Sequence, residues 1–96
     1  MFNKLKQFKD LRDQAKTLQS QLATETAVGE AAWGKLKVTM NGNQQVLSVE
    51  IDPELLQNKE KLQDAIKDAT NDAIKKIQRT MAMKMQQMGG LSGLGL

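Results

Sequence analysis

Hydrophobic residues recur every three or four positions through the first two dozen residues of the chain. They fall on one face of a helix, and no glycine or proline interrupts the segment; the stripe consists of Phe8, Leu11, Ala15, Leu18 and Leu22, widened by Leu5. The pattern predicts an amphipathic helix over residues 3–25. A helix with a single apolar stripe needs something to cover that stripe, so we expect it to lean on another part of the molecule.

The central part of the chain alternates between apolar and polar residues, which is typical of strands. One strand spans residues 34–40 and another spans about 45–51. The residues that share a face are Leu36, Val38 and Met40 in the first strand, and Leu47, Val49 and Ile51 in the second. A weaker strand over residues 26–33 contains Gly29, which suggests a bulge or an edge. We expect a small antiparallel sheet of about three strands over residues 26–51.

The two clear strands are joined by Asn41-Gly42. Both residues tolerate the positive φ of a type I′ turn, so the pair predicts a hairpin. A longer loop that includes Asn43 and Gln44 is the alternative, and it leaves the register at the turn open.

A helix start follows the sheet at Asp52-Pro53-Glu54. Asp52 can cap free backbone N–H groups, and a proline in the first helical position loses no hydrogen bond. We expect a short helical turn over residues 53–57, then a second candidate cap at Asn58.

Nothing breaks a helix from residue 59 to about residue 88. The expected apolar stripe consists of Leu62, Ile66, Ala69, Ala73, Ile77, Met81, Met85 and Met88, with Ala65 and Ile74 beside it. Thirty residues in a helix span ~45 Å, which is longer than a small sheet can cover. Part of this helix must therefore protrude or pack on another chain. Gly89-Gly90 ends it, and residues 89–96 are expected to form a flexible tail.

The chain length favours one α+β domain, over residues 1–88, and 96 residues leave room for only a modest core. Small cores without disulfides often gain burial by pairing with a second copy. The chain has no cysteine, which is consistent with a reducing cytosol. No apolar run approaches the ~18 residues of a membrane span, and the charged start is unlike a signal peptide. We expect a cytoplasmic protein without a membrane partner.

Charge is distributed unevenly, although the net charge is only +3. Residues 1–20 carry five basic and two acidic side chains, residues 21–72 carry five and nine, and residues 73–96 carry four and none. Basic ends around an acidic middle favour a polyanionic partner, while solvated helix faces are the plainer interpretation. The candidate contacts are Lys4, Lys6, Lys9, Arg12, Lys16, Lys75, Lys76, Arg79 and Lys84.

The sequence lacks most residues from which active sites are built. It has no histidine, cysteine or tyrosine, and its serines therefore have no histidine base. Asp64, Asp68 and Asp72 lie one helical turn apart, but their lysine neighbours indicate a solvated face rather than a metal site. We expect a protein that binds rather than catalyses, with no metal, no other cofactor and no small-molecule substrate.

Two central segments combine these signals in a specific order. They are residues 36–42, Leu-Lys-Val-Thr-Met-Asn-Gly, and residues 46–56, Val-Leu-Ser-Val-Glu-Ile-Asp-Pro-Glu-Leu-Leu. Together with the Asn71-Asp72-Ala73 stretch, the basic first helix and the Met- and Gly-rich end, they resemble the YbaB/EbfC family of bacterial nucleoid-associated proteins. The likeness covers nearly the whole chain, which departs from the family in being short and in having a brief tail.

The resemblance implies a homodimer whose protomers join through their sheets and whose helices project as arms, in a tweezer-like shape. It also implies binding to double-stranded DNA at the nucleoid, with little sequence preference and with effects on DNA conformation and gene expression. If the first and last helices pack antiparallel, their basic ends meet at the arm tip. The candidate dimer contacts are Trp33, Leu36, Val38, Leu47 and Val49.

Other functions compete with this one. The methionines at positions 81, 83, 85 and 88 could form an adaptable surface, which is typical of a protein–protein adaptor or a chaperone-like module. An interfacial helix that touches anionic membranes is a weaker alternative, because the long helix lacks bulky aromatic residues. Trp33 could stack on a base, but packing in a core or an interface is the more common role of a lone tryptophan.

Overall fold

The computed structural model describes residues 2–87, with side chains from residue 9 onward. The elements in chain order are α1 (Phe2–Ala23), β1 (Thr26–Ala31), β2 (Leu36–Asn41), β3 (Val46–Ile51), the 3₁₀ helix η1 (Pro53–Gln57) and α2 (Lys59–Gln87). The strands form one antiparallel sheet in the order β1-β2-β3. The predicted α+β fold is thereby confirmed. Met88 and the predicted tail lie outside the described residues.

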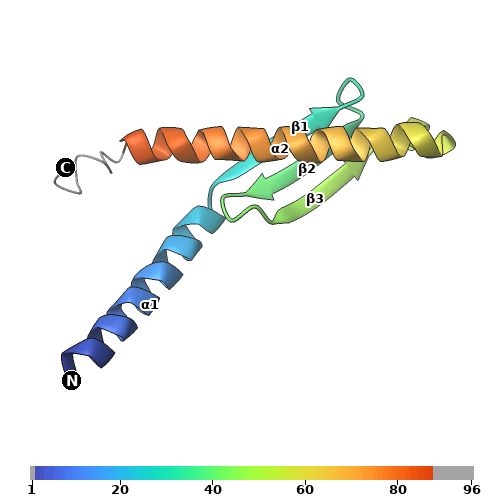
Figure 1. Ribbon diagram of the computed structural model, residues 1–96. Helices are drawn as coiled ribbons and strands as arrows, with labels where there is room; N and C mark the ends of the chain where they lie inside the picture. Colours follow the sequence, from blue (N-terminus) through green and yellow to red (C-terminus); the bar gives the residue numbers. More distant parts are fainter. Residues whose placement is uncertain (1, 88–96) are drawn as a thin grey trace.

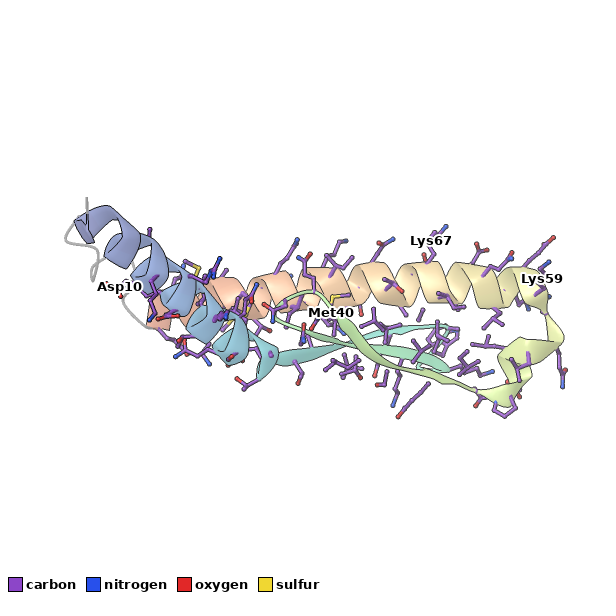
Figure 2. The ribbon with its side chains drawn as sticks, turned by 90° about the horizontal axis from the view of Figure 1, so that it is seen from below. Asp10, Met40, Lys59 and Lys67 are labelled. Atoms are coloured by element: carbon purple, nitrogen blue, oxygen red, sulfur yellow. The ribbon has the colours of Figure 1, made fainter. Side chains whose placement is uncertain are left out.

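The molecule is elongated, with principal extents of 63 × 27 × 17 Å. Figure 1 shows why: α2 crosses one face of the sheet and continues beyond it, while α1 leaves the same end of the sheet in another direction. In the view of Figure 2, Lys67 projects from the side of α2 away from the sheet, and Met40 lies between the sheet and the helix. The sheet therefore covers one side of α2 and leaves the other open to solvent.

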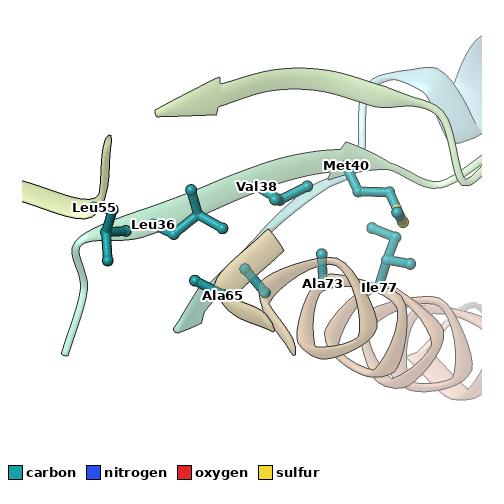
Figure 3. Close-up of a cluster of buried hydrophobic side chains, with 8 residues drawn as sticks. Leu36, Val38, Met40, Leu55, Ala65, Ala73 and Ile77 are labelled. Carbon is teal, nitrogen blue, oxygen red and sulfur yellow. The ribbon is translucent and has the colours of Figure 1, made fainter. Parts of the chain in front are cut away.

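The core is a single layer between β2 and α2 (Figure 3). Leu36, Val38 and Met40 share the buried face of β2, as their alternation predicts. The residues that meet them are Ala65, Ala69, Ala73 and Ile77 of α2 together with Leu55 of η1. The stripe predicted for the long helix is thus shifted toward its alanines, and Ile66 is 39% exposed. Small side chains at every fourth position let the helix lie close to the sheet.

Gly29 is the point of closest approach between β1 and α2. A Cβ atom at this position would overlap the backbone of Ala69 and Ala73. Gly29 pairs with Val38 in an unbroken register, so it lies in a regular edge strand and not at a bulge. The irregularity of the sheet lies instead between Thr39 and Met40, where the pairing with β3 shifts. The glycine is needed for helix packing rather than for strand geometry.

The Asn41-Gly42 pair forms a longer loop than a two-residue turn. Asn41 is the last residue of β2, and the positive φ of the loop falls on Gln44, at 60°. The Asn41 side chain holds the loop together, because its Oδ1 accepts hydrogen bonds from the backbone N–H groups of Asn43 and Gln45, both at 3.0 Å. The type I′ prediction is therefore wrong, and the alternative of an extended loop is correct. The side chain of asparagine replaces the tight turn by an Asx-type loop.

The hairpin between β1 and β2 contains the tight turn of the sheet. Residues 32, 33 and 34 have φ of 53°, 62° and 81°, so β1 ends at Ala31, two residues earlier than predicted. Alanine and tryptophan rarely adopt this left-handed conformation, which is why the sequence did not reveal the turn. Beside it, a hydrogen bond from Lys35 to Glu54 raises the pKa of the lysine.

The predicted helix caps are both confirmed. Asp52 Oδ1 accepts a hydrogen bond from the Glu54 N–H at 2.9 Å, with Pro53 at the start of η1. Asn58 Oδ1 accepts from the Lys61 N–H at 3.0 Å and so caps α2. The two caps fix where each helix begins, and with it the position of α2 over the sheet.

β3 lies outside the area that α2 covers. Val49 pairs with Val38 and Ile51 pairs with Leu36, so both point to the same side of the sheet as the core. They are nevertheless 46% and 39% exposed, because α2 packs on β1 and β2. A strip of apolar side chains therefore remains open beside the helix.

Candidate nucleic-acid interface

The direction of α1 is set by the loop between β2 and β3. The Gly42 N–H donates to the carbonyl oxygen of Leu22 at 3.0 Å, and the Asn43 side-chain amide donates to the carbonyl oxygen of Gln19, also at 3.0 Å. The Leu22 carbonyl is one of the four that a helix leaves open at its C-terminal end. A Cβ atom at Gly42 would meet the carbonyl oxygen of Leu22. The close contact anchors the base of α1 on the sheet.

From this anchor, α1 and α2 separate toward their far ends (Figure 1). The packing partners of α2 are chiefly β1, β2 and η1. The antiparallel packing of the two helices, with both basic ends meeting at one tip, is therefore wrong for this structure. Its physical reason is that the apolar face of α2 from Ala65 to Ile77 is already occupied by the sheet. The basic residues lie on two separate prongs, which are α1 and the second half of α2.

On α1, three basic side chains share one side of the helix. Lys9, Arg12 and Lys16 are three and four residues apart and all exposed. Within the described residues none of them takes part in an ion pair. Lys4 and Lys6 belong to the first turns of the same helix, and their side chains lie outside the described part. This prong offers a row of cations to a polyanion.

On α2, the four basic candidates divide into two kinds. Lys76 Nζ lies 3.0 Å from Asp72 Oδ2 and donates to the Val28 carbonyl at 3.2 Å, while Lys84 pairs with Glu25. Lys75 and Arg79, one turn apart, are exposed and take part in no ion pair in the part of the chain that the structure describes. Lys75 and Arg79 are therefore better placed than Lys76 and Lys84 to contact phosphate.

Asp72 helps to hold α2 on the edge strand. Its Oδ2 accepts a hydrogen bond from the Glu30 N–H at 2.9 Å. This backbone bond, followed by the bond from Lys76, lowers the pKa of the Asp72 carboxyl from its usual 3.8. The carboxylate thus has a structural role, and it draws Lys76 inward toward β1.

The remaining acidic residues of α2 lie nearer its start. Lys67 is 3.9 Å from Asp64, an exposed pair three residues apart on the helix. Among residues 2–87 the structure contains no group of three or more acidic side chains that could hold a metal ion. Residues 59–72 of α2 carry four acidic and three basic side chains, whereas residues 73–87 carry four basic and no acidic ones.

An apolar groove lies where the two prongs join. Its volume is about 590 Å³, and its walls come from the last turns of α1, the β2–β3 loop and the second half of α2. The apolar side chains that line it are Leu18, Leu22, Ile77, Met81, Ala82 and Met85. Its two charged residues, Glu25 and Lys84, pair with each other.

The candidate dimer contacts lie in three different places. Leu36 and Val38 are fully buried under α2 within the protomer. Leu47 and Val49 on β3 are 53% and 46% exposed. Trp33 stands entirely in solvent on the strained turn between β1 and β2. Only the last three present side-chain surface to another molecule.

The two ion pairs of this region differ in how well the sequence predicts them. The Asp72–Lys76 pair is four residues apart on a helix, a spacing that favours an ion pair. The Glu25–Lys84 pair joins residues 59 positions apart, and no local sequence pattern predicts it. The groove has no local signal for the same reason, because its two walls belong to opposite ends of the chain.

Comparison with known proteins places the chain in a family. It matches the model of the YbaB/EbfC DNA-binding family over residues 1–92. A nucleoid-associated protein of Syntrophobacter fumaroxidans is 39% identical, over 99% of this chain and 89% of that protein. A nucleoid-associated protein of Synechococcus sp. is 40% identical, over 96% of this chain and 86% of that protein.

A solved structure has the same fold. It is that of an uncharacterized protein from Helicobacter pylori, with a TM-score of 0.64 and 21% identity, over 84% of this chain and 96% of that one. None of the helices in residues 2–87 is long and apolar enough to cross a membrane. The chain is a member of the YbaB/EbfC DNA-binding family.

Proposed function

We propose that this protein binds double-stranded DNA, with little sequence preference, through basic side chains on both prongs. The observation that carries the proposal is the group of exposed cations that have no ion-pair partner among the described residues. They are Lys9, Arg12 and Lys16 on α1, and Lys75 and Arg79 on α2. Lys4 and Lys6 extend the first set, while Lys76 and Lys84 are held by acidic neighbours and contribute less.

The proposed mechanism is electrostatic. Cations that neutralise DNA phosphates release condensed counterions, which gives affinity without reading the bases. Long, mobile lysine and arginine side chains on two helices can follow a phosphate backbone without a fixed spacing. The protein works by this binding and needs neither a catalytic group nor a cofactor.

A homodimer completes the proposal. The exposed apolar strip on β3 is suited to a second copy, with Leu47 and Val49 as contacts and Val46 and Ile51 beside them. Leu36 and Val38 are already covered by α2 and lie beside Ile51 and Val49 on the same face of the sheet. Two copies would carry four prongs, which can grip one duplex at separate points and change its path. The nucleoid is the corresponding location.

The test is a titration of unrelated duplexes at two salt concentrations, followed by fluorescence anisotropy, with the oligomer mass measured in parallel. We expect similar affinities for all sequences and a steep loss of affinity as salt rises. Affinity that does not change with salt, or strong preference for one duplex, would contradict the mechanism.

Charge reversal on α2 tests the site itself. The double variant K75E/R79E should weaken binding to every duplex about equally. The matched control is K61E/K67E, which changes the net charge by the same amount on the first half of the same helix. Equal losses in the two variants would indicate that net charge, and not this site, determines binding.

A protein–protein adaptor remains the second candidate, because Met83 and Met85 are 54% and 62% exposed. The match to a DNA-binding family favours the nucleic-acid proposal. Weak DNA binding at physiological salt together with a stable protein complex would favour the adaptor.

A further inference from the structure

The apolar stripe of α1 has no packing partner among the described residues of its own protomer. Leu18 and Leu22 line the groove between the prongs, and Leu11 and Ala15 continue the same stripe outward along the helix. Leu11 is 63% exposed and Leu18 is 54% exposed. Because α1 and α2 diverge from their common base, α2 of the same chain leaves this stripe uncovered (Figure 1).

The opposite wall of the groove is a matching row of apolar side chains on α2. Ile77, Met81 and Met85 recur every fourth residue, and Met85 is 62% exposed. Side chains at this spacing form a ridge against which another helix can pack. The groove between the two walls has a volume of about 590 Å³. It is therefore wide enough to take side chains from a second molecule.

The polar residues around the groove favour an uncharged occupant. Its only charged lining residues, Glu25 and Lys84, pair with each other. The other polar side chains that line it are those of Gln21, Gln44 and Gln78. A charged group placed here would lose water and would have to compete with an existing ion pair. An apolar surface with uncharged polar edges leaves that pair intact.

The apolar stripe of α1 has the spacing by which a helix occupies such a groove. Leu11, Ala15, Leu18 and Leu22 alternate steps of four and three residues. This is the pattern of anchors with which an amphipathic helix lies in an apolar groove or pairs with a second helix. The same stripe is thus both one wall of the groove and a candidate to fill it.

The edges of that stripe are mostly uncharged. Gln14 and Gln21 border it on one side of the helix. Gln19 and Arg12 border it on the other side. A second α1 therefore brings glutamines to a groove whose rim also carries glutamines, and Arg12 is the only charge at its edges. Farther round the described part of the helix lie the other charged side chains, Lys9, Asp10, Asp13 and Lys16.

We propose that the groove of each protomer receives the α1 helix of a second copy. The stripe of the incoming α1 packs against the stripe of the resident α1 on one side and against the methionine row of α2 on the other. Each copy gives one helix and receives one, so the contact is isologous. This contact rests on the homodimer of the proposed function, but not on DNA binding. It gives each arm one helix from either copy.

Contacts between copies can be observed with two differently labelled samples of the full-length protein. One chain carries isotope only in its leucine methyl groups and the other only in its methionine methyl groups, and the two are mixed in denaturant and refolded together. We expect nuclear Overhauser cross-peaks from Leu11 to Met81 or Met85. In such a sample these cross-peaks arise only between different chains. A dimer that lacks them overturns the proposed contact.

Leu11→Ser tests the energetic contribution of the stripe. Leu11 is not among the residues that line the groove of its own protomer, so the substitution removes apolar surface offered to the second copy. The dissociation constant of the dimer, measured by sedimentation, should rise about tenfold or more, as expected when a buried leucine is lost. Met83→Ser is the matched control, because Met83 is 54% exposed on α2 and does not line the groove. Equal dissociation constants for the parent and both variants overturn the proposed contact.

Val49→Ser separates this contact from the rest of the proposed homodimer. Val49 belongs to the exposed strip on β3, away from the groove. If Val49→Ser weakens the dimer while Leu11→Ser does not, the β3 interface stands and the helix contact is overturned. A protein that stays monomeric at the concentration of the resonance experiment overturns both. DNA affinity is measured separately and decides neither.

Discussion

All buried side chains of α2 lie in residues 59–77, whereas residues 78–87 contain none. Figure 1 shows that α2 continues past the sheet. The first part contains all four acidic side chains of the helix and the alanines that touch β1 and β2. The second part contains no acid, and its methionines are partly or largely exposed. The buried face of the helix thus ends at Ile77, and the proposed DNA contacts Lys75 and Arg79 lie on exposed positions on either side of that point. Substitutions in the buried face should change stability, and those at Lys75 and Arg79 should change binding.

The largest contrast is expected between two apolar positions on either side of this boundary. Ile77→Ala removes a fully buried side chain and should lower the free energy of unfolding by about 2–5 kcal/mol. Met83→Ala, at a 54% exposed position, should change it by less than about 0.5 kcal/mol. Urea denaturation followed by circular dichroism measures both. Similar losses of stability would mean that residues 78–87 are packed as tightly as residues 59–77.

Gly29→Ala probes the contact between β1 and residues 59–77 of α2. The added methyl group meets the backbone of Ala69 and Ala73, which cannot move aside as a side chain can. We expect a loss of about 1–3 kcal/mol, typical of overpacking. The same denaturation experiment gives the value. A neutral Gly29→Ala would show that α2 is free to shift on the sheet.

Neutralising charges on the basic part of α2 should reveal which cations reach DNA. K75Q/R79Q should reduce the slope of log affinity against log salt by about 0.9 for each phosphate that the variant no longer neutralises. At 0.1 M salt this corresponds to roughly tenfold in affinity per phosphate. K76Q/K84Q removes the same charge from side chains already paired with Asp72 and Glu25, so we expect a smaller change. Indistinguishable slopes would show that the intramolecular pairs open on binding.

The smallest effect is expected at Asp72, on the boundary between β1 and α2. Asp72→Asn weakens the bonds from Glu30 and Lys76 and should cost less than about 1 kcal/mol near neutral pH. Because folding lowers the pKa of this carboxyl, its contribution is fully present above the unfolded value. It is lost as the pH falls from about 3.8 through the lower folded value. Denaturation at pH 7 and at successively lower pH should show the difference from the parent chain shrinking. A constant difference would assign it to packing alone.

Much of the local structure was predictable from short-range signals. The caps at Asp52 and Asn58, the alternation of Leu36, Val38 and Met40, and the extent of the long helix all depend on neighbours within a few residues. Such signals act in the same way in most folds, because capping and amphipathic burial are local requirements. The turn at Trp33 escaped prediction because its residues rarely adopt positive φ.

The sequence by itself determined the elements, the family resemblance and the separation of charge along the chain, since each is written in consecutive residues. Only the tertiary structure decided that α1 and α2 diverge, that Lys76 and Lys84 are held by Asp72 and Glu25, and that a groove opens between the prongs. These features join residues up to 59 positions apart. Helix directions follow from which faces the sheet occupies and where the loop at Gly42 anchors α1, and neither is encoded in a local pattern.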